Sequence, residues 1–304
     1  MELPMSVTVV EVGPRDGLQN EATPVPTRDK IAFIDRLSAS GLRRIEVTAF
    51  VNPARIPQLA DAEQVCAGIT RAPGVTYSAL VPNERGFDRA AACGLSEIAV
   101  FLSASETHNQ RNIGCSIDEA FGRFAPVLAR AAAEGIAVRG YVSTAFGCPY
   151  EGWVDPARVT QVARRLLDMG CYQVSLGDTT GMGDPSQVAG QVSLISDGGV
   201  GVERIALHLH DTRGTGLANA LAGLQAGVTT FDASVGGLGG CPYAPGATGN
   251  VATDELVYMF ERMGVATGVD TEALLEAAEL VGAAIGIEPP SRYLKATRAT
   301  EALT

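Results

Sequence analysis

The chain has 304 residues, 46% of them hydrophobic and 19% charged, so it can bury a large core and is not a disordered protein. Its 23 basic and 34 acidic residues leave a net charge of −11, which argues against nucleic acid or an anionic membrane as a partner. No apolar segment approaches the ~20 residues of a membrane span, and we expect no secretory signal. The six cysteines are widely spaced and form no C-x-x-C motif, which predicts reduced thiols in a cytoplasmic protein.

Short β-branched segments alternate with helix-like segments from end to end, and we predict eight strands. They are Val7–Val12, Arg44–Phe50, Thr76–Val81, Ile98–Ser103, Ala137–Ser143, Gln173–Leu176, Ile205–His210 and Thr230–Val235. Segments of helical period lie between them, including Lys30–Ser40, Gln58–Ile69, Ile117–Glu134 and Pro156–Met169. Eight β/α units in a row predict an α/β fold, the (β/α)8 TIM barrel. A doubly wound open sheet is the alternative, but the G-x-G-x-x-G turn expected after its first strand is missing.

We expect a single domain over residues 1–304, because no Pro/Ser-rich linker interrupts the chain. The predicted barrel covers residues 7–263, and a C-terminal helical extension covers residues 264–304. Within the extension, Asp270–Ile285 has the pattern of one amphipathic helix, which Pro289 and Pro290 end. We expect the extension to pack on the barrel.

Unusual polar side chains occur at the C-terminal ends of the predicted strands, where the active sites of such barrels lie. They are Arg15, Asp16 and Gln19 after the first strand, Glu46 in the second, Asp178 after the sixth, His208 and His210 in the seventh, and Cys241 and Asn250 after the eighth. Their positions predict a functional site at that end of the barrel. His108, by contrast, is expected at the surface.

His208 and His210 are two residues apart in a predicted strand, so their side chains point to the same face. Two such imidazoles can hold one divalent metal ion, and the nearby acids and amide suit magnesium, manganese or zinc. The alternative is a pair of hydrogen-bonded interior histidines that hold no ligand.

Two carboxylates near the start of the chain are candidates for the same site. Asp16 follows Arg15 and can reach a metal ion or accept a proton, although an Asx-turn explains it as well. Glu46 lies between Ile45 and Val47 and points into the barrel, where an unpaired carboxylate is costly. Arg15 is its expected partner, and a structural ion pair and a direct catalytic role are both open for Glu46.

The segment Val235–Asn250 contains six glycines, which fits a lid that closes over a substrate or a simple long loop. Cys241 within it can serve as a general acid or a nucleophile. Asp178 is a candidate for substrate binding, as are Arg15 and Gln19, although a helix cap explains Asp178 equally well.

Together, a divalent metal ion, an acid, an arginine and a thiol suit chemistry at a carbon next to a carbonyl. A base removes a hydroxyl proton, the C–C bond breaks, and an acid protonates the departing carbanion. This is a retro-aldol or retro-Claisen cleavage, and the reverse reaction condenses an enolate with a ketone.

Seven motifs resemble the 3-hydroxy-3-methylglutaryl-CoA (HMG-CoA) lyase family, over residues 7–263. They are Glu11-Val-Gly-Pro-Arg-Asp-Gly-Leu-Gln-Asn-Glu21, Ile45-Glu-Val-Thr48, Gly140-Tyr-Val-Ser143, Gly147-Cys-Pro-Tyr-Glu-Gly152, Ser175-Leu-Gly-Asp-Thr179, His208-Leu-His-Asp-Thr212 and Gly237-Leu-Gly-Gly-Cys-Pro-Tyr243. The last is highly specific to that family, whereas the Arg-Asp and His-x-His pairs are shared with isopropylmalate and homocitrate synthases.

The resemblance implies a (β/α)8 barrel that cleaves HMG-CoA to acetyl-CoA and acetoacetate with Mg²⁺ or Mn²⁺. The implied metal ligands are Asp16, His208, His210 and Asn250. By position, Arg15 stabilises the thioester enolate, Glu46 supports Arg15, and Cys241 is the acid of a mobile loop. The base for the substrate hydroxyl is left open, with Asp16 as one candidate.

Three departures from the family pattern concern the substrate: Ala22, Arg213-Gly-Thr215 and the segment 286–292. They leave a related 3-hydroxy-3-alkylglutaryl-CoA or another 3-hydroxyacyl-CoA as an alternative. A Claisen-condensing acyltransferase of the same barrel family is a second alternative, and a non-catalytic metal- or acyl-CoA-binding barrel is a third. The expected partner is an acyl-CoA, with no nucleic acid or membrane, and the chain is expected to form a homodimer or a higher homo-oligomer. Leucine degradation is the family's usual setting.

Overall fold

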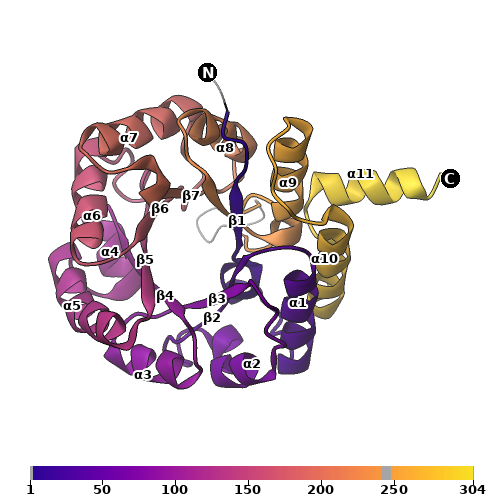
Figure 1. Ribbon diagram of the computed structural model, residues 1–304, viewed down its shortest axis with the longest axis horizontal. Coiled ribbons are helices and arrows are strands. Elements are labelled where there is room, and N and C mark those ends of the chain that lie inside the picture. The colour runs from indigo at the N-terminus through magenta and orange to yellow at the C-terminus, as the bar shows by residue number, and fades with distance from the viewer. Residues whose placement is uncertain (1–2, 241–247, 304) are drawn as a thin grey trace.

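In the computed structural model, which describes residues 3–240 and 248–303, eight parallel strands close into a barrel in chain order (Figure 1). The strands are β1 (Thr8–Glu11), β2 (Arg44–Ala49), β3 (Thr76–Leu80), β4 (Glu97–Ser103), β5 (Ala137–Ser143), β6 (Gln173–Gly177), β7 (Ile205–His208) and β8 (Thr230–Ala233). The barrel closes where β1 pairs with β8, with Glu11 beside Ala233. The predicted TIM barrel and its eight strands are confirmed.

Helices surround the barrel on the outside (Figure 1). They are α1 (Thr27–Ala39), α2 (Ala62–Gly68), α3 (Glu84–Ala92), α4 (Glu106–Ile113), α5 (Ile117–Glu134), α6 (Pro156–Asp168), α7 (Pro185–Asp197), α8 (Gly216–Gln225) and α9 (Thr253–Arg262). The predicted helix Gln58–Ile69 is divided into a 3-10 turn, Pro57–Leu59, and α2. Asp155 and Asp184 cap α6 and α7 by accepting backbone N–H groups, and each precedes a first-turn proline.

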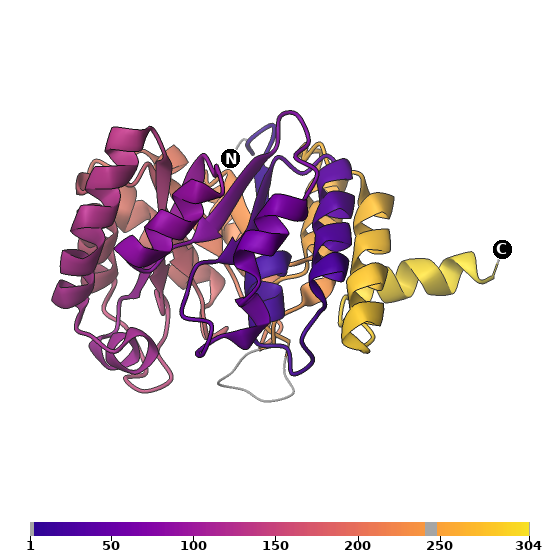
Figure 2. The same ribbon diagram turned by 90° about the horizontal axis from the view of Figure 1, so that it is seen from below.

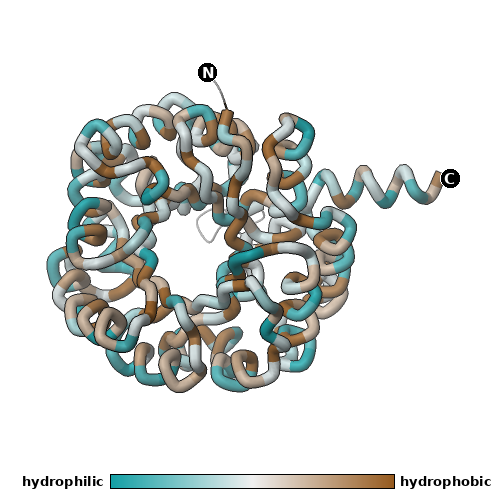
Figure 3. The backbone as a smooth tube through the Cα atoms, in the orientation of Figure 1, coloured by the Kyte–Doolittle hydropathy of each residue, from teal (hydrophilic) through white to brown (hydrophobic). Residues whose placement is uncertain are grey.

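The apolar core lies between the strands and the surrounding helices. Ile45 of β2 and Ile98 of β4 are fully buried there, in one cluster with Phe33 and Leu37 of α1. Hydrophilic and hydrophobic residues alternate along the helices, as expected where each helix has one buried face (Figure 3). Within residues 3–240 and 248–303, no helix is long and apolar enough to cross a membrane.

The C-terminal extension contains two helices, α10 (Thr271–Ile285) and α11 (Arg292–Glu301). Helix α10, which was predicted, begins after its cap Asp270 and packs along α1. Helix α11 was not predicted, and it projects away from the barrel beyond α10 (Figures 1 and 2). The start of α11 nevertheless contacts α9: the Tyr293 ring stacks on the Tyr258 ring with centroids 4.7 Å apart, and Leu294 is buried in the main core. The extension thus contacts the barrel through α10 and through the start of α11.

Candidate active site

A cavity of about 290 Å³ opens among the strand ends and is lined by both polar and apolar side chains. Its polar lining includes Arg15, Asp16, Gln19, His208 and His210, and its apolar lining includes Val51, Ile56, Leu80 and Phe101. The sequence-predicted residues of two separate segments thus meet in one pocket.

A tight turn after β1 places Arg15 and Asp16 in this pocket. The turn covers Gly13–Gly17, and the N–H groups of Arg15 and Asp16 both reach the carbonyl of Val12. A side chain at Gly17 would put its Cβ only 2.7 Å from the Ser234 hydroxyl, so glycine is needed there for close packing. The two functional side chains are therefore presented by a turn that other buried residues hold in place.

The side chain of Glu11, the last residue of β1, stabilises this turn through hydrogen bonds. Its fully buried carboxylate accepts hydrogen bonds from the N–H groups of Gly13 (2.7 Å) and Val235 (3.0 Å) and from the Thr253 hydroxyl (2.6 Å). It therefore joins the ends of β1 and β8 to the start of α9. Burial raises the pKa of Glu11 to about 7, although these hydrogen bonds counter part of the effect.

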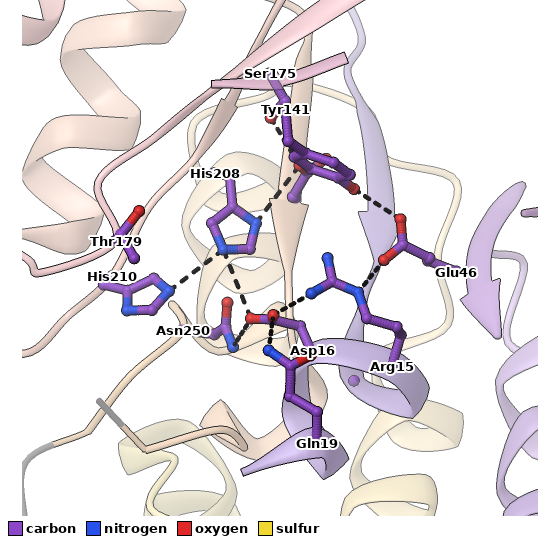
Figure 4. A network of polar contacts seen from close by, with 12 residues as sticks. Arg15, Asp16, Gln19, Glu46, Tyr141, Ser175, Thr179, His208, His210 and Asn250 are labelled. Atoms are coloured by element: carbon purple, nitrogen blue, oxygen red, sulfur yellow. Dashed lines mark hydrogen bonds and ion pairs between the residues drawn. The ribbon is translucent and has the colours of Figure 1, made fainter. Parts of the chain in front are cut away.

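Asp16, His208 and His210 converge as one potential set of metal ligands. The Nε2 atoms of the two histidines are 3.3 Å apart, and Nε2 of His208 lies 3.7 Å from Oδ2 of Asp16 (Figure 4). His208 is the last residue of β7, and His210 forms an isolated bridge with Asn250. The prediction that the two imidazoles share one face is confirmed, and the bridge brings Asn250 into the same group.

The chemistry of these side chains fits a divalent cation. The amide nitrogen of Asn250 donates to Oδ2 of Asp16 (3.0 Å) and to the Leu238 carbonyl (3.1 Å). Among the described residues, its buried oxygen has no hydrogen-bond partner, which leaves it available as a ligand. Two imidazole nitrogens, a carboxylate and an amide oxygen form a donor set for magnesium or manganese.

The protonation states also fit a metal site. Burial, followed by the neighbouring His208, lowers the pKa of His210 to about 3, so its ring is the neutral imidazole that metals require. Burial raises the pKa of Asp16, but Arg15 and the two histidines outweigh it and bring the pKa to about 2. Asp16 is therefore an ionised carboxylate at neutral pH.

Arg15 lies between two carboxylates. Its Nε contacts Glu46 and its Nη1 contacts Asp16, which confirms the expected ion pair with Glu46 (Figure 4). The other oxygen of Glu46 accepts a hydrogen bond from the Tyr141 hydroxyl at 3.0 Å, and Arg15 lies over the Tyr141 ring at 5.6 Å. Burial lowers the pKa of Arg15, but Asp16 and Glu46 raise it by more, so the guanidinium stays charged.

Three further predictions have different outcomes. Gln19 lines the pocket and donates to Oδ1 of Asp16 at 2.9 Å. The buried carboxylate of Asp178 instead accepts the N–H groups of Met182 (2.9 Å) and Gly183 (3.1 Å), which shapes its own loop. Substrate binding by Asp178 stays a prediction. Cys241 lies outside the described residues.

His108 lies elsewhere than predicted, and Arg213, one of the departures from the family pattern, has a structural role. His108 is 1% exposed, lines the pocket and contacts the Ser103 hydroxyl at 2.5 Å, so its expected surface position was wrong. Arg213 donates to the carbonyls of Thr180 (2.6 Å) and Gly181 (3.2 Å). It therefore links the loops after β6 and β7.

Sequence reasoning did not single out several polar residues of the barrel interior, among them Tyr141 and Asp232. Tyr141 lines the pocket, and Asp232 lies 3.6 Å from Nδ1 of His208. The signal for Asp232 was available, because it is an acid inside an apolar strand, as is Glu46.

The fold and the site define a (β/α)8 barrel with a potential metal site and a charged arginine at its mouth. The model of the HMGL-like family matches residues 6–281, and the chain belongs to this family.

Similar proteins are known from bacteria and animals. The 3-hydroxy-3-isohexenylglutaryl-CoA/hydroxymethylglutaryl-CoA lyase of Pseudomonas aeruginosa is 51% identical, over 97% of this chain and 98% of its own. The mitochondrial hydroxymethylglutaryl-CoA lyase of Mus musculus is 50% identical, over 97% of this chain and 90% of its own.

Solved structures agree with these relatives. A hydroxymethylglutaryl-CoA lyase from Pseudomonas aeruginosa has a TM-score of 0.97 and 50% identity, covering 99% of this chain and 100% of its own. An HMG-CoA lyase from Acinetobacter baumannii, solved with coenzyme A and 3-methylmalate, has a TM-score of 0.92 and 41% identity. That alignment covers 97% of this chain and 96% of the other.

Proposed function

We propose that this protein is a carbon–carbon lyase that cleaves HMG-CoA to acetyl-CoA and acetoacetate with the help of Mg²⁺ or Mn²⁺. The observation that carries the proposal is the convergence of Asp16, His208 and His210 beside the charged Arg15, in one pocket. This arrangement occurs in a chain that is about half identical, over almost its whole length, to proteins named HMG-CoA lyases.

Asp16, His208, His210 and Asn250 would hold the metal ion. When bound, a divalent cation supplies Lewis acidity toward a hydroxyl and a carboxylate or carbonyl oxygen of the substrate. The burial of all four residues supports this role, because it keeps competing water away from the ligand atoms.

In the cleavage step, a base takes the proton of the 3-hydroxyl group, and Asp16 is our candidate for it. The C2–C3 bond breaks, the hydroxyl carbon becomes the ketone of acetoacetate, and the bonding electrons pass to the thioester as an enolate. Arg15 is positioned to stabilise that enolate, and Glu46 and Tyr141 hold its guanidinium in place. Cys241, outside the described residues, is proposed as the acid that protonates the enolate carbon to give acetyl-CoA.

The test is acetoacetate release from HMG-CoA with added Mg²⁺ or Mn²⁺, and again with EDTA. Fast release that EDTA abolishes is the expected result. Release that EDTA leaves unchanged would refute the metal requirement. A protein that binds one equivalent of metal but releases no acetoacetate would refute HMG-CoA as the substrate.

A related 3-hydroxy-3-alkylglutaryl-CoA is a second candidate substrate. The apolar residues of the pocket, Val51, Ile56, Leu80 and Phe101, can accept an alkyl group larger than methyl. The name of the Pseudomonas aeruginosa relative includes such a substrate. Comparing kcat/KM for the methyl and isohexenyl substrates decides between them, and the one with the higher value is the preferred substrate.

Further predictions concern the setting of the reaction. We propose acyl-CoA as the sole class of partner ligand. Leucine degradation as the pathway, a cytoplasmic location and a homodimer or higher homo-oligomer stay predictions. Fractionation of the producing cells and size-exclusion chromatography with light scattering test the last two.

A further inference from the structure

A buried ion pair lies across the barrel interior next to the proposed metal ligands. Asp232 of β8 is 2% exposed, and its Oδ1 is 2.7 Å from Nη1 of Arg139 of β5. Its Oδ2 accepts a hydrogen bond from the Ser175 hydroxyl at 2.8 Å. Arg139 is held in turn by the side chains of Gln173 (3.0 Å) and Tyr141 (3.1 Å). The Asp232 carboxylate is therefore fixed in place from two sides.

The same Oδ2 atom that accepts from Ser175 also faces the ring of His208. His208 and Asp232 are direct partners in the register between β7 and β8. Oδ2 of Asp232 lies 3.6 Å from Nδ1 of His208, which is longer than a hydrogen bond. Within the described part of the chain, that buried Nδ1 has no hydrogen-bond partner.

The two nitrogens of the His208 ring thus face different groups. Nε2 points to Asp16 (3.7 Å) and to Nε2 of His210 (3.3 Å), where the metal ion would lie. Nδ1 points to Asp232 on the opposite edge of the ring. Metal-binding histidines almost always donate their second ring N–H to a carboxylate, a carbonyl or water, which fixes the tautomer and the ring orientation.

We propose that Asp232 is a positioning residue: it accepts the Nδ1–H of His208 and thereby aims Nε2 at the metal ion. The inference rests on the proposed metal site. The proposal requires the imidazole to rotate so that the 3.6 Å separation shortens to a hydrogen bond of about 2.9 Å. Arg139 and Ser175 prevent the carboxylate from moving away, so the ring must adapt to Asp232.

A purely structural ion pair is the competing explanation, and the chain offers a matched control for it. Glu97, the first residue of β4, is 6% exposed and pairs with Arg44, the first residue of β2. The Tyr172 hydroxyl also donates to Glu97, at 3.1 Å. This pair has the same chemistry, but it lies at the N-terminal ends of the strands, away from the histidines.

The first experiment compares Mn²⁺ affinity by titration calorimetry in the wild type, Asp232→Asn and Glu97→Gln. Asparagine keeps the size of the side chain but replaces one acceptor oxygen with a donor, which then faces either Arg139 or His208. We expect Asp232→Asn to bind Mn²⁺ roughly 10- to 100-fold more weakly, and Glu97→Gln to bind it as the wild type does.

Each other outcome of the titration has a defined meaning. Equal Mn²⁺ affinity in Asp232→Asn and the wild type would overturn the inference while leaving the proposed function intact. Equal losses in both variants would show a structural effect and would overturn it as well. A wild type that binds no Mn²⁺ would overturn the metal site of the proposed function itself.

A second measurement needs no substitution at Asp232, and so it holds even if Asp232→Asn does not fold. The chain has three histidines, so ¹⁵N-histidine NMR of the metal-free wild type in EDTA gives few signals. Without metal, coordination does not dictate the tautomer of His208, so the tautomer reports on Asp232. Spectra of His108→Gln and His210→Gln assign the signals of His208 by elimination. We expect the tautomer with the proton on Nδ1, and a proton on Nε2 instead would overturn the inference.

Discussion

Glu46→Gln separates the role of Arg15 from the role of the metal ligands. Glu46 is 1% exposed and contacts Nε of Arg15 and the Tyr141 hydroxyl, but none of the proposed ligands. Glutamine can still accept from Arg15 through its oxygen, so the shape of the site is kept and one buried negative charge is removed. The change therefore weakens the hold on the guanidinium without creating a cavity.

The size of the effect follows from the kind of contact that is lost. A hydrogen bond to a charged group contributes about 1.5–3 kcal/mol, which corresponds to roughly 10- to 100-fold in rate. We expect kcat for acetoacetate release to fall by that factor. We expect Mn²⁺ affinity to stay within about threefold, because Asp16 keeps its contacts with Asn250 and Gln19.

The assay is steady-state acetoacetate release at saturating Mn²⁺, with calorimetric Mn²⁺ titration of the same samples. Glu97→Gln serves again as the control for removing a buried carboxylate, and it should keep its kcat. Two results would refute the reasoning: an unchanged kcat in Glu46→Gln, or a loss of activity that disappears when Mn²⁺ is raised above the concentration that saturates the wild type. The second would mean that Glu46 acts through the metal site and not through Arg15.

Three further predictions concern single residues. His210→Ala should lose Mn²⁺ binding and activity together in calorimetry and the acetoacetate assay, and full activity without added metal would contradict the ligand assignment. Cys241→Ser should bind Mn²⁺ normally but turn over ~10²-fold or more slowly, as for loss of a general acid; an unchanged rate would remove Cys241 from the mechanism. Glu11 has a folded-state pKa of about 7, above its usual 4.5, so the folded state favours its protonated form. Stability should therefore fall as pH rises from about 4.5 to about 7, by at most ~3 kcal/mol. In urea unfolding, the free energy of unfolding of Glu11→Gln should rise relative to that of the wild type between pH 5 and pH 8. A difference between the two that is independent of pH would contradict the raised pKa.

The barrel could be predicted from the sequence because its signals are local. Each strand is a short β-branched segment, and the caps Asp155 and Asp184 mark where helices begin. Helix α11 also has a cap, because the Ser291 side chain accepts the N–H of Leu294, but the helix buries little apolar surface and so has no hydrophobic period to mark it. The boundary between the 3-10 turn Pro57–Leu59 and α2 was missed because only Ala60 and Asp61 separate them, with no glycine or proline to mark a break.

The site was predictable where a residue type was out of place in its surroundings. An acid inside an apolar strand indicated Glu46, and the same rule would have found Asp232. His108 was misplaced because a histidine in a polar segment gives no sign of burial; its partner, Ser103, lies in the preceding strand. Tyr141 supports Arg15 through Glu46, and this contact depends on β2 and β5 both facing the barrel interior. No local sequence pattern shows that.

The hydrogen bond between Asn250 and Asp16 joins residues 234 positions apart, and it exists only where β1 meets β8. Contacts of such long sequence separation form late, because the entropy of closing the chain must be overcome first. During synthesis, the turn that carries Asp16 leaves the ribosome long before the segment that carries Asn250. The ligand set is therefore completed only when the last strand closes the ring, so metal uptake reports a finished barrel.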